Sequence, residues 1–187
     1  LTSPIAHRGL HDAASGRVEN SPSAIKAAIN SGYGIEIDVQ LSKDGAAIVF
    51  HDNHLDRLTA HSGAIVDKSE RELSQIILDG SQDTIPTLNQ MLALVAGQVP
   101  LLIEIKDQDG DLGKNVGELE AAVADALQSY KGHTAVMSFN PNAVAVFAKL
   151  QPQTPVGLVT DSFSAQEWPT LAASLREHLA EISDFER

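Results

Sequence analysis

Short apolar runs alternate with helix-like segments along most of the chain, and this alternation limits the folds open to it. Strands buried on both faces read as continuous apolar runs, so the pattern predicts a parallel α/β sheet with helices outside it. The six predicted strands are Ser3–His7, 35–41, 46–50, Val99–Lys106, 133–139 and 155–160. A doubly wound sheet and a barrel both fit, although a full (β/α)₈ barrel usually needs about 250 residues. With 187 residues, the chain suits a single domain over 1–187.

Helix signals fill the spaces between these strands. Asn20 or Ser21 followed by Pro22 predicts a capped helix that stops near Gly32, since a capping residue before proline marks a helix start. Further helices are predicted over 70–78, 86–95, 117–129, 141–150 and 165–180. Residues 53–85 are mixed and polar, and we interpret them as a short insertion or loop region.

Composition excludes several classes of partner and site. The formal charge of −12 argues against a nucleic-acid ligand, which needs a basic face. No apolar run of about 18 residues occurs, so we expect no stable membrane insertion. Without cysteine, any metal must be held by oxygen or imidazole ligands. The lack of cysteine and of a visible leader favours a cytoplasmic location, although the chain opens on Leu1 and residues can precede it; the oligomeric state stays unknown.

Three carboxylates are predicted to share the interior of the sheet. Strand side chains alternate between faces, so Glu36 and Asp38 project together, and Glu104 does the same from a later strand. Buried carboxylates repel one another unless a cation neutralises them, and oxygen ligands suit Mg²⁺ or Ca²⁺. The alternative is a structural network in which each carboxylate pairs with Arg8 or Lys106. We favour a metal site because unpaired buried charge is costly.

Two histidines and two cations lie at the ends of the same strands. His7 and His51 each follow an apolar run, and imidazoles that titrate near neutrality can act as a general acid and a general base. Arg8 and Lys106 are suited to bind phosphate oxygens. A divalent cation, an anion-binding pair and two imidazoles together indicate phosphodiester hydrolysis.

Several motifs together resemble the glycerophosphodiester phosphodiesterase family. They are IAHRG, EN at Glu19-Asn20, IEIDVQLSKDGAAIVFHD, IPTL at Ile85–Leu88, LLIEIK and SFNP at Ser138–Pro141, and they span about residues 4 to 160. The resemblance implies a TIM barrel that hydrolyses glycerophosphodiesters to glycerol 3-phosphate and an alcohol with a divalent cation.

The resemblance also implies roles for particular residues. It maps the catalytic histidine pair onto His7 and His51 and the phosphate-binding pair onto Arg8 and Lys106. The metal carboxylates map onto Glu36, Asp38 and Glu104. The sequence departs from the family in the short segment 53–85 and in lacking the last two β-α units of the barrel.

Other functions remain open at this point. A phospholipase-D-like enzyme of the same fold would act on lysophospholipids, but the chain has no cysteine for disulfide-linked loops and few aromatic residues. A non-catalytic barrel that binds phosphate or metal would be expected to have lost a histidine or a carboxylate, and all are present. A sugar-phosphate isomerase or aldolase would leave the histidine pair unexplained.

Overall fold

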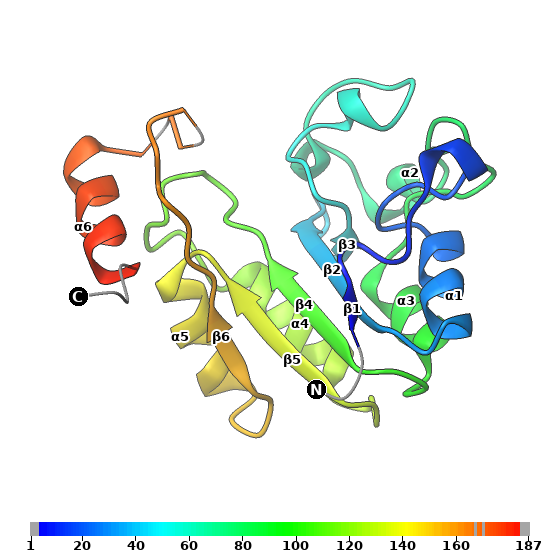
Figure 1. Cartoon of the computed structure of the whole chain (residues 1–187). Coiled ribbons are helices and arrows are strands. Elements are labelled where there is room, and N and C mark those ends of the chain that lie inside the picture. The colour runs from blue at the N-terminus through cyan, green and yellow to red at the C-terminus, as the bar shows by residue number, and fades with distance from the viewer. Residues whose placement is uncertain (1–3, 167, 170, 184–187) are drawn as a thin grey trace.

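Five parallel strands form a curved sheet in this computed structural model, which describes residues 4–166, 168–169 and 171–183 (Figure 1). Their spatial order is β1-β2-β4-β5-β6. The strands are β1 (Ile5–Ala6), β2 (Gly34–Leu41), β4 (Leu101–Ile105), β5 (Thr134–Ser138) and β6 (Val156–Leu158). The predicted parallel α/β architecture is therefore confirmed, while Ser3 of the first predicted strand lies outside the described residues.

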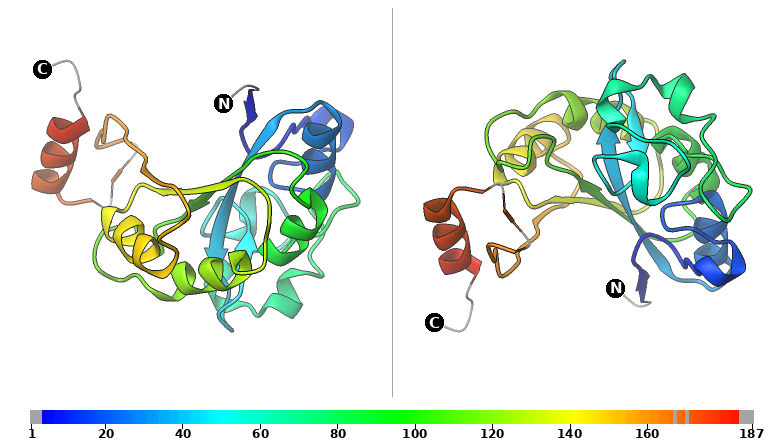
Figure 2. Two further views of the ribbon diagram at one scale, coloured as in Figure 1. Left: turned by 90° about the horizontal axis from the view of Figure 1, so that it is seen from below. Right: turned by 90° about the horizontal axis from the view of Figure 1, so that it is seen from above.

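Four helices cover the convex face of this sheet (Figure 2). They are α1 (Pro22–Asn30), α3 (Leu88–Val95), α4 (Glu118–Leu127) and α5 (Pro141–Leu150). Ser21 is the cap that the sequence left undecided, since its hydroxyl accepts the Ala24 N–H. Thr87 and Gln90 form a reciprocal capping box at the start of α3, so the predicted helix beginning at Pro86 opens two residues later.

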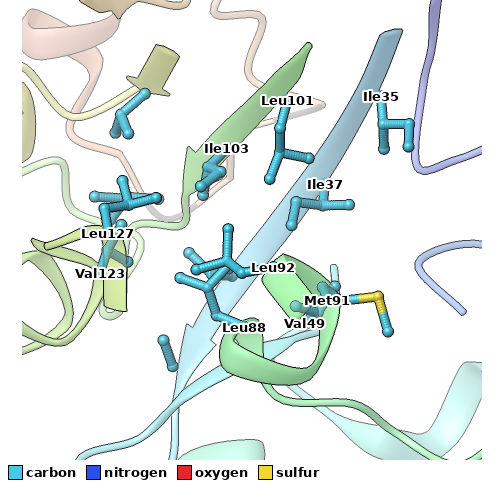
Figure 3. Packing of buried hydrophobic residues seen from close by; sticks show 14 of the residues in the cluster. Ile35, Ile37, Val49, Leu88, Met91, Leu92, Leu101, Ile103, Val123 and Leu127 are labelled. Carbon is cyan, nitrogen blue, oxygen red and sulfur yellow. The ribbon is translucent and has the colours of Figure 1, made fainter. Parts of the chain in front are cut away.

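The main core lies between the sheet and these helices (Figure 3). Ile35, Ile37 and Val39 are fully buried and face the helices, as the alternation of β2 predicts. Burying a side chain such as Ile37 contributes about 1.5–3 kcal/mol. The opposite face of β2 is therefore the one that carries Glu36 and Asp38.

The third strand, β3 (Ala47–Val49), runs antiparallel to β2, so it departs from the parallel sheet that the alternation of strands and helices predicts. The turn after Leu41 is too short for the crossover that a parallel pair needs. Val39 pairs with Val49, and the Phe50 N–H donates to the Asp38 carbonyl at 3.1 Å. The end of β2 therefore projects past the rim of the sheet, and β3 brings His51 back towards the level of Asp38.

Residues 53–85 are built from short pieces around a second, smaller core. The pieces are the 3₁₀ turns η2 (Leu55–Arg57) and η3 (Ile65–Asp67) and the helix α2 (Glu70–Leu73). The helix predicted over 70–78 ends at Leu73 because Ile76 and Leu78 are buried while Ile77 is 56% exposed, an alternation of extended backbone. Ile77 forms a bridge with Thr84.

The last helix, α6 (Ala173–Ser183), starts later than the predicted 165–180 segment, of which residues 167 and 170 lie outside the description. Pro169 disfavours helical backbone at Trp168. Trp168 and Phe163 pack together 5.3 Å apart in a third cluster with Leu179 of α6. Among the helices described, none has the length and apolar character needed to cross a bilayer, and the cytoplasmic location stays a prediction.

Candidate active site at the carboxyl ends of the strands

Three buried carboxylates meet at the carboxyl end of the sheet. The register of β2 and β4 places Asp38 beside Glu104, and Glu36 lies two residues earlier on the same face of β2. Each carboxylate has one oxygen within 4.8 Å of a ligand oxygen on each of the others. The three residues are only 3%, 1% and 7% exposed, so the triad lies in a poorly solvated interior.

Glu36 has the least favourable position in this triad. Burial, followed by the neighbouring Asp38 charge, raises the pKa of Glu36 to about 8. The Arg8 backbone N–H donates to Glu36 Oε2 at 2.9 Å, whereas Oε1 is buried without a hydrogen-bond partner in the described chain. An unsatisfied buried oxygen beside two other carboxylates fits a bound cation, so the donor set on this chain matches an oxygen-coordinated metal.

Asp38 is held by three side chains, two from the loop between β1 and α1 and one that follows β4. The Asn20 amide donates to Asp38 Oδ2 at 2.9 Å and accepts the Asp38 backbone N–H at 3.3 Å. Arg8 Nε lies 3.3 Å from Asp38 Oδ2, and Lys106 Nζ lies 3.5 Å from Oδ1. Lys106 also donates to Glu104 at 2.7 Å. The pairing of carboxylates with Arg8 and Lys106, which the sequence offered as an alternative to metal binding, is therefore present alongside the metal-compatible triad.

The loop between β1 and α1 has an unusual backbone that brings Arg8 and Asn20 to Asp38. Arg8 and Asn20 both have a positive φ, at 56° and 58°, which costs free energy for residues with a side chain. Gly9 follows with φ 77°, and a Cβ there would come within 3.0 Å of Ala24. The Asn20 N–H donates to the Arg8 carbonyl at 2.9 Å, which locks the two strained residues together.

His7 lies at the open side of the triad. Its Nε2 is 3.9 Å from Glu36 Oε2, and its side chain is 69% exposed. Partial burial and then the adjacent Arg8 guanidinium lower the pKa of His7. The imidazole is therefore biased towards its neutral form, which can accept a proton.

His51 is positioned from two directions. Its Nδ1 lies 2.6 Å from Asp52 Oδ1, and the buried Gln40 amide donates to its backbone carbonyl at 2.8 Å. Burial alone would raise the pKa of Asp52, but hydrogen bonds from Arg57 and His51 hold that pKa down at about 2. Asp52 therefore stays ionised and orients the ring of His51 through Nδ1, so Nε2 is the ring nitrogen outside this contact.

Ion pairs connect the two halves of this site. Arg57 binds both Glu19 and Asp52, and Glu19 in turn accepts from Arg8 Nη1 at 2.9 Å. The structure thus brings the predicted residues into one connected group, although their catalytic and binding roles stay predictions. The sequence analysis gave no role to the supporting residues Gln40, Asp52 and Arg57. Gln40 and Asp52 lie within the motif IEIDVQLSKDGAAIVFHD, whereas Arg57 lies five residues beyond it.

The fold and the site together define a barrel-type α/β protein with three buried carboxylates, spaced to suit a metal ion, at the carboxyl ends of its strands, where barrel enzymes carry their active sites. The sequence profile of the glycerophosphoryl diester phosphodiesterase family matches residues 7–186, and the chain belongs to this family.

Curated relatives agree with this assignment. A Bacillus subtilis protein named for this activity is 34% identical over 167 residues, which cover 83% of this chain and 65% of the relative. The glycerophosphodiester phosphodiesterase of Bacillus altitudinis is 31% identical and is matched over 86% of this chain and 67% of its own length. The chain thus spans about two thirds of the length of these relatives.

Solved structures support the same fold. A phosphodiesterase from Oleispira antarctica, in complex with the product sn-glycerol-3-phosphate, superposes with a TM-score of 0.75 at 30% identity over 96% of this chain and 72% of that chain. A glycerophosphodiester phosphodiesterase from Agrobacterium tumefaciens gives a TM-score of 0.69 at 26% identity over 83% of this chain and 66% of that chain. The curved sheet is therefore an arc of the TIM-barrel type, as the sequence resemblance implied; β1 and β6 do not pair with each other in the described part of the chain.

Proposed function

We propose that the polypeptide containing this chain hydrolyses glycerophosphodiesters to glycerol 3-phosphate and an alcohol with the help of a divalent cation. The observation that carries the proposal is the buried carboxylate triad, which has His7 3.9 Å from Glu36 and two cationic side chains against Asp38. The family assignment and the relatives named for this activity support it.

Glu36, Asp38 and Glu104 would hold the cation, with Mg²⁺ and Ca²⁺ as the ions that an all-oxygen donor set favours. When bound, such an ion supplies positive charge that polarises phosphoryl oxygens. The environment of Glu36 suits this charge, since its buried Oε1 accepts no hydrogen bond from the residues that the structure describes.

Arg8 and Lys106 are proposed to bind the substrate phosphate. Both are fixed beside Asp38, Arg8 through its strained backbone and Lys106 through its contact with Glu104. Each cationic group is thereby preorganised against the triad, and preorganised charge stabilises the extra negative charge of a phosphoryl transition state. This arrangement also explains how an acidic chain can attract an anion, since steering depends on the local field.

His7 and His51 are proposed to transfer the protons. The lowered pKa of His7 suits a general base that deprotonates the nucleophile. His51, anchored through Nδ1 to the ionised Asp52, is suited to give a proton from Nε2 to the leaving alkoxide. The substrate itself would be a small molecule.

The deciding assay uses glycerophosphocholine and the natural polypeptide that contains these residues. Metal is removed with a chelator, and release of glycerol 3-phosphate is followed as Mg²⁺ or Ca²⁺ is added back. We expect turnover to disappear on chelation and to return with the cation. A folded protein that binds the cation but never releases glycerol 3-phosphate would instead be a non-catalytic barrel, and the proposal would be wrong.

A further inference from the structure

A continuous path of ion pairs joins the proposed phosphate-binding arginine to the proposed catalytic histidine. It begins at Asp38 of the carboxylate triad and leads away from the triad through Arg8. Its members in order are Asp38, Arg8, Glu19, Arg57, Asp52 and His51. Arg57 is the central member and the one that comes from the segment 53–85.

Arg57 holds two carboxylates at once, each through two N–H groups. Its Nε and Nη2 donate to the two Asp52 oxygens at 2.6 and 2.8 Å. Its Nη1 and Nη2 donate to the two Glu19 oxygens at 3.0 and 2.7 Å. A planar guanidinium can make this double fork, whereas a lysine ammonium cannot.

Each of those carboxylates orients a different functional side chain. Asp52 takes His51 Nδ1 at 2.6 Å, and Glu19 takes Arg8 Nη1 at 2.9 Å while Arg8 Nε lies against Asp38. Without Arg57, Glu19 and Asp52 would keep their charges but lose the group that fixes both carboxylate planes. Both orientations would then loosen together.

We propose that Arg57 is a positioning residue. By holding the carboxylates of Asp52 and Glu19, it fixes the orientations of His51 and Arg8 relative to each other. The inference rests on the proposed function for the roles of His51 and Arg8. Arg57 is 47% exposed on its side chain, so as a mere surface ion pair it would contribute little to stability. The geometry of Arg57 is better explained by a role in orienting His51 and Arg8 than by a role in stabilising the fold. The two roles predict different effects on kcat and on the melting temperature.

The test compares Arg57→Gln and Arg57→Lys with wild type. Both variants should lower kcat by about 10- to 100-fold, the range seen when groups that orient active-site ligands are lost. The melting temperature should change little in either variant. The kcat of Arg57→Lys should stay low because lysine keeps the positive charge but cannot make paired hydrogen bonds to both carboxylates. Arg17→Gln is the matched control, since Arg17 is a half-buried arginine whose guanidinium pairs at 3.2 Å with Asp12; its kcat should equal that of wild type.

A double-mutant cycle separates positioning from a general effect on the fold. If Arg57 acts through Asp52, Arg57→Gln should cost much less in kcat when Asp52→Asn is already present. Full additivity of the two losses would overturn the proposed route through Asp52. A fall in melting temperature without a fall in kcat would show a merely structural ion pair and would also overturn the proposal.

A second readout does not depend on turnover. The proton on His51 Nδ1 should give a downfield NMR signal that exchanges slowly with water, and this signal should broaden or vanish in Arg57→Gln but persist in Arg17→Gln. If the protein proves inactive yet shows this change, the proposed function fails while the positioning by Arg57 stands. If the protein is active and the signal is unchanged in Arg57→Gln, the positioning role is wrong and the proposed function stands.

Discussion

At the scale of single residues, the site buries several carboxylates close together, and hydrogen bonds compensate only part of the cost of burying their charges. Glu36 shows this most clearly, because it receives one backbone N–H on Oε2 and nothing from the described chain on Oε1. Such a residue lowers the stability of the metal-free protein, and the same carboxylate favours the binding of a cation. Removing the Glu36 carboxylate should therefore raise the stability of the metal-free protein and weaken cation binding.

Glu36→Gln should stabilise the metal-free protein and abolish its stabilisation by Mg²⁺ or Ca²⁺. The pKa of Glu36 is raised from 4.5 to about 8, so the native state holds a proton that the unfolded state releases. Its contribution to stability is present below pH 4.5 and is lost as the pH rises to about 8. At pH 8 and above, with chelator present, the variant should gain on the order of 1–3 kcal/mol.

Urea denaturation from pH 4 to 9, with and without the cation, measures this effect. The slope of stability against pH should flatten in Glu36→Gln. Glu120→Gln is the matched control, because Glu120 is equally buried but caps α4 through the Gly117 N–H. A cation-dependent stabilisation that survives in Glu36→Gln would place the ion elsewhere.

His51→Ala should lose far more activity on a poor leaving group than on a good one. Removal of a general acid costs about 10²–10⁴-fold when the leaving group is an alkoxide. A p-nitrophenolate leaves without protonation, so the loss there should be much smaller, whereas His7→Ala should impair both substrates alike. Cation affinity should be nearly unchanged in His51→Ala, and a strong loss of that affinity would instead place His51 among the metal ligands.

At the scale of elements, the sequence predicted the strands and helices well where periodicity and caps agreed. The helix at Pro141–Leu150 has the predicted bounds because Asn140 caps it and Pro141 begins it. The direction of β3 does not follow from its apolar run alone, but the short hairpin-like turn SKDG at Ser42–Gly45 fits the antiparallel pairing with β2. The helix predicted over 70–78 failed because isoleucines at 76 and 77 fit an extended segment as well as a helix.

The residues of the candidate site could be predicted from local sequence patterns, whereas the residues that orient them could not. The carboxylates and histidines follow from strand alternation and strand ends, which are local features of the sequence. Gln40 and Arg57 act across distances in sequence, through Gln108, Glu19 and Asp52, and no local pattern reports such contacts. Sequence reasoning therefore finds the reacting groups of this site more readily than the groups that orient them.

Gln40→Leu should disturb the hairpin of β2 and β3 at the point where it carries His51. Gln40 donates to the His51 carbonyl at 2.8 Å and to Asn53 at 2.9 Å, and accepts from Gln108 at 3.0 Å. Leucine fills similar space but leaves these groups unpaired, which should cost about 1–3 kcal/mol in unfolding free energy. It should also lower kcat, because the backbone of His51 loses its tie to β2.

The control for this prediction is Gln151→Leu. Gln151 also donates its amide to a backbone carbonyl, that of Ala124, but it joins α5 to α4 away from the site. It should lower the unfolding free energy without a specific loss in kcat. Equal effects of the two variants on kcat, at matched stability, would show that Gln40 supports only the fold.

At the scale of the whole molecule, the sheet is an arc whose two outer strands are β1 and β6. The helices protect its convex face (Figure 2). Alternation along β2 and β4 places the triad on the opposite face. At the β6 edge, Val156 and Leu158 are 40% and 45% exposed. An exposed strand edge with apolar side chains is a template for pairing with another chain.

The 187-residue chain, prepared alone, should therefore self-associate with rising concentration, and Leu158→Lys should suppress this association. Lysine on an edge strand disfavours strand addition because a second strand would bury its charge. Sedimentation velocity over a hundredfold range of concentration measures the effect. Val66→Lys is the control, since Val66 is 50% exposed but lies on η3 rather than on β6. If Val66→Lys suppressed association as strongly as Leu158→Lys, general surface charge rather than the open edge would explain the result.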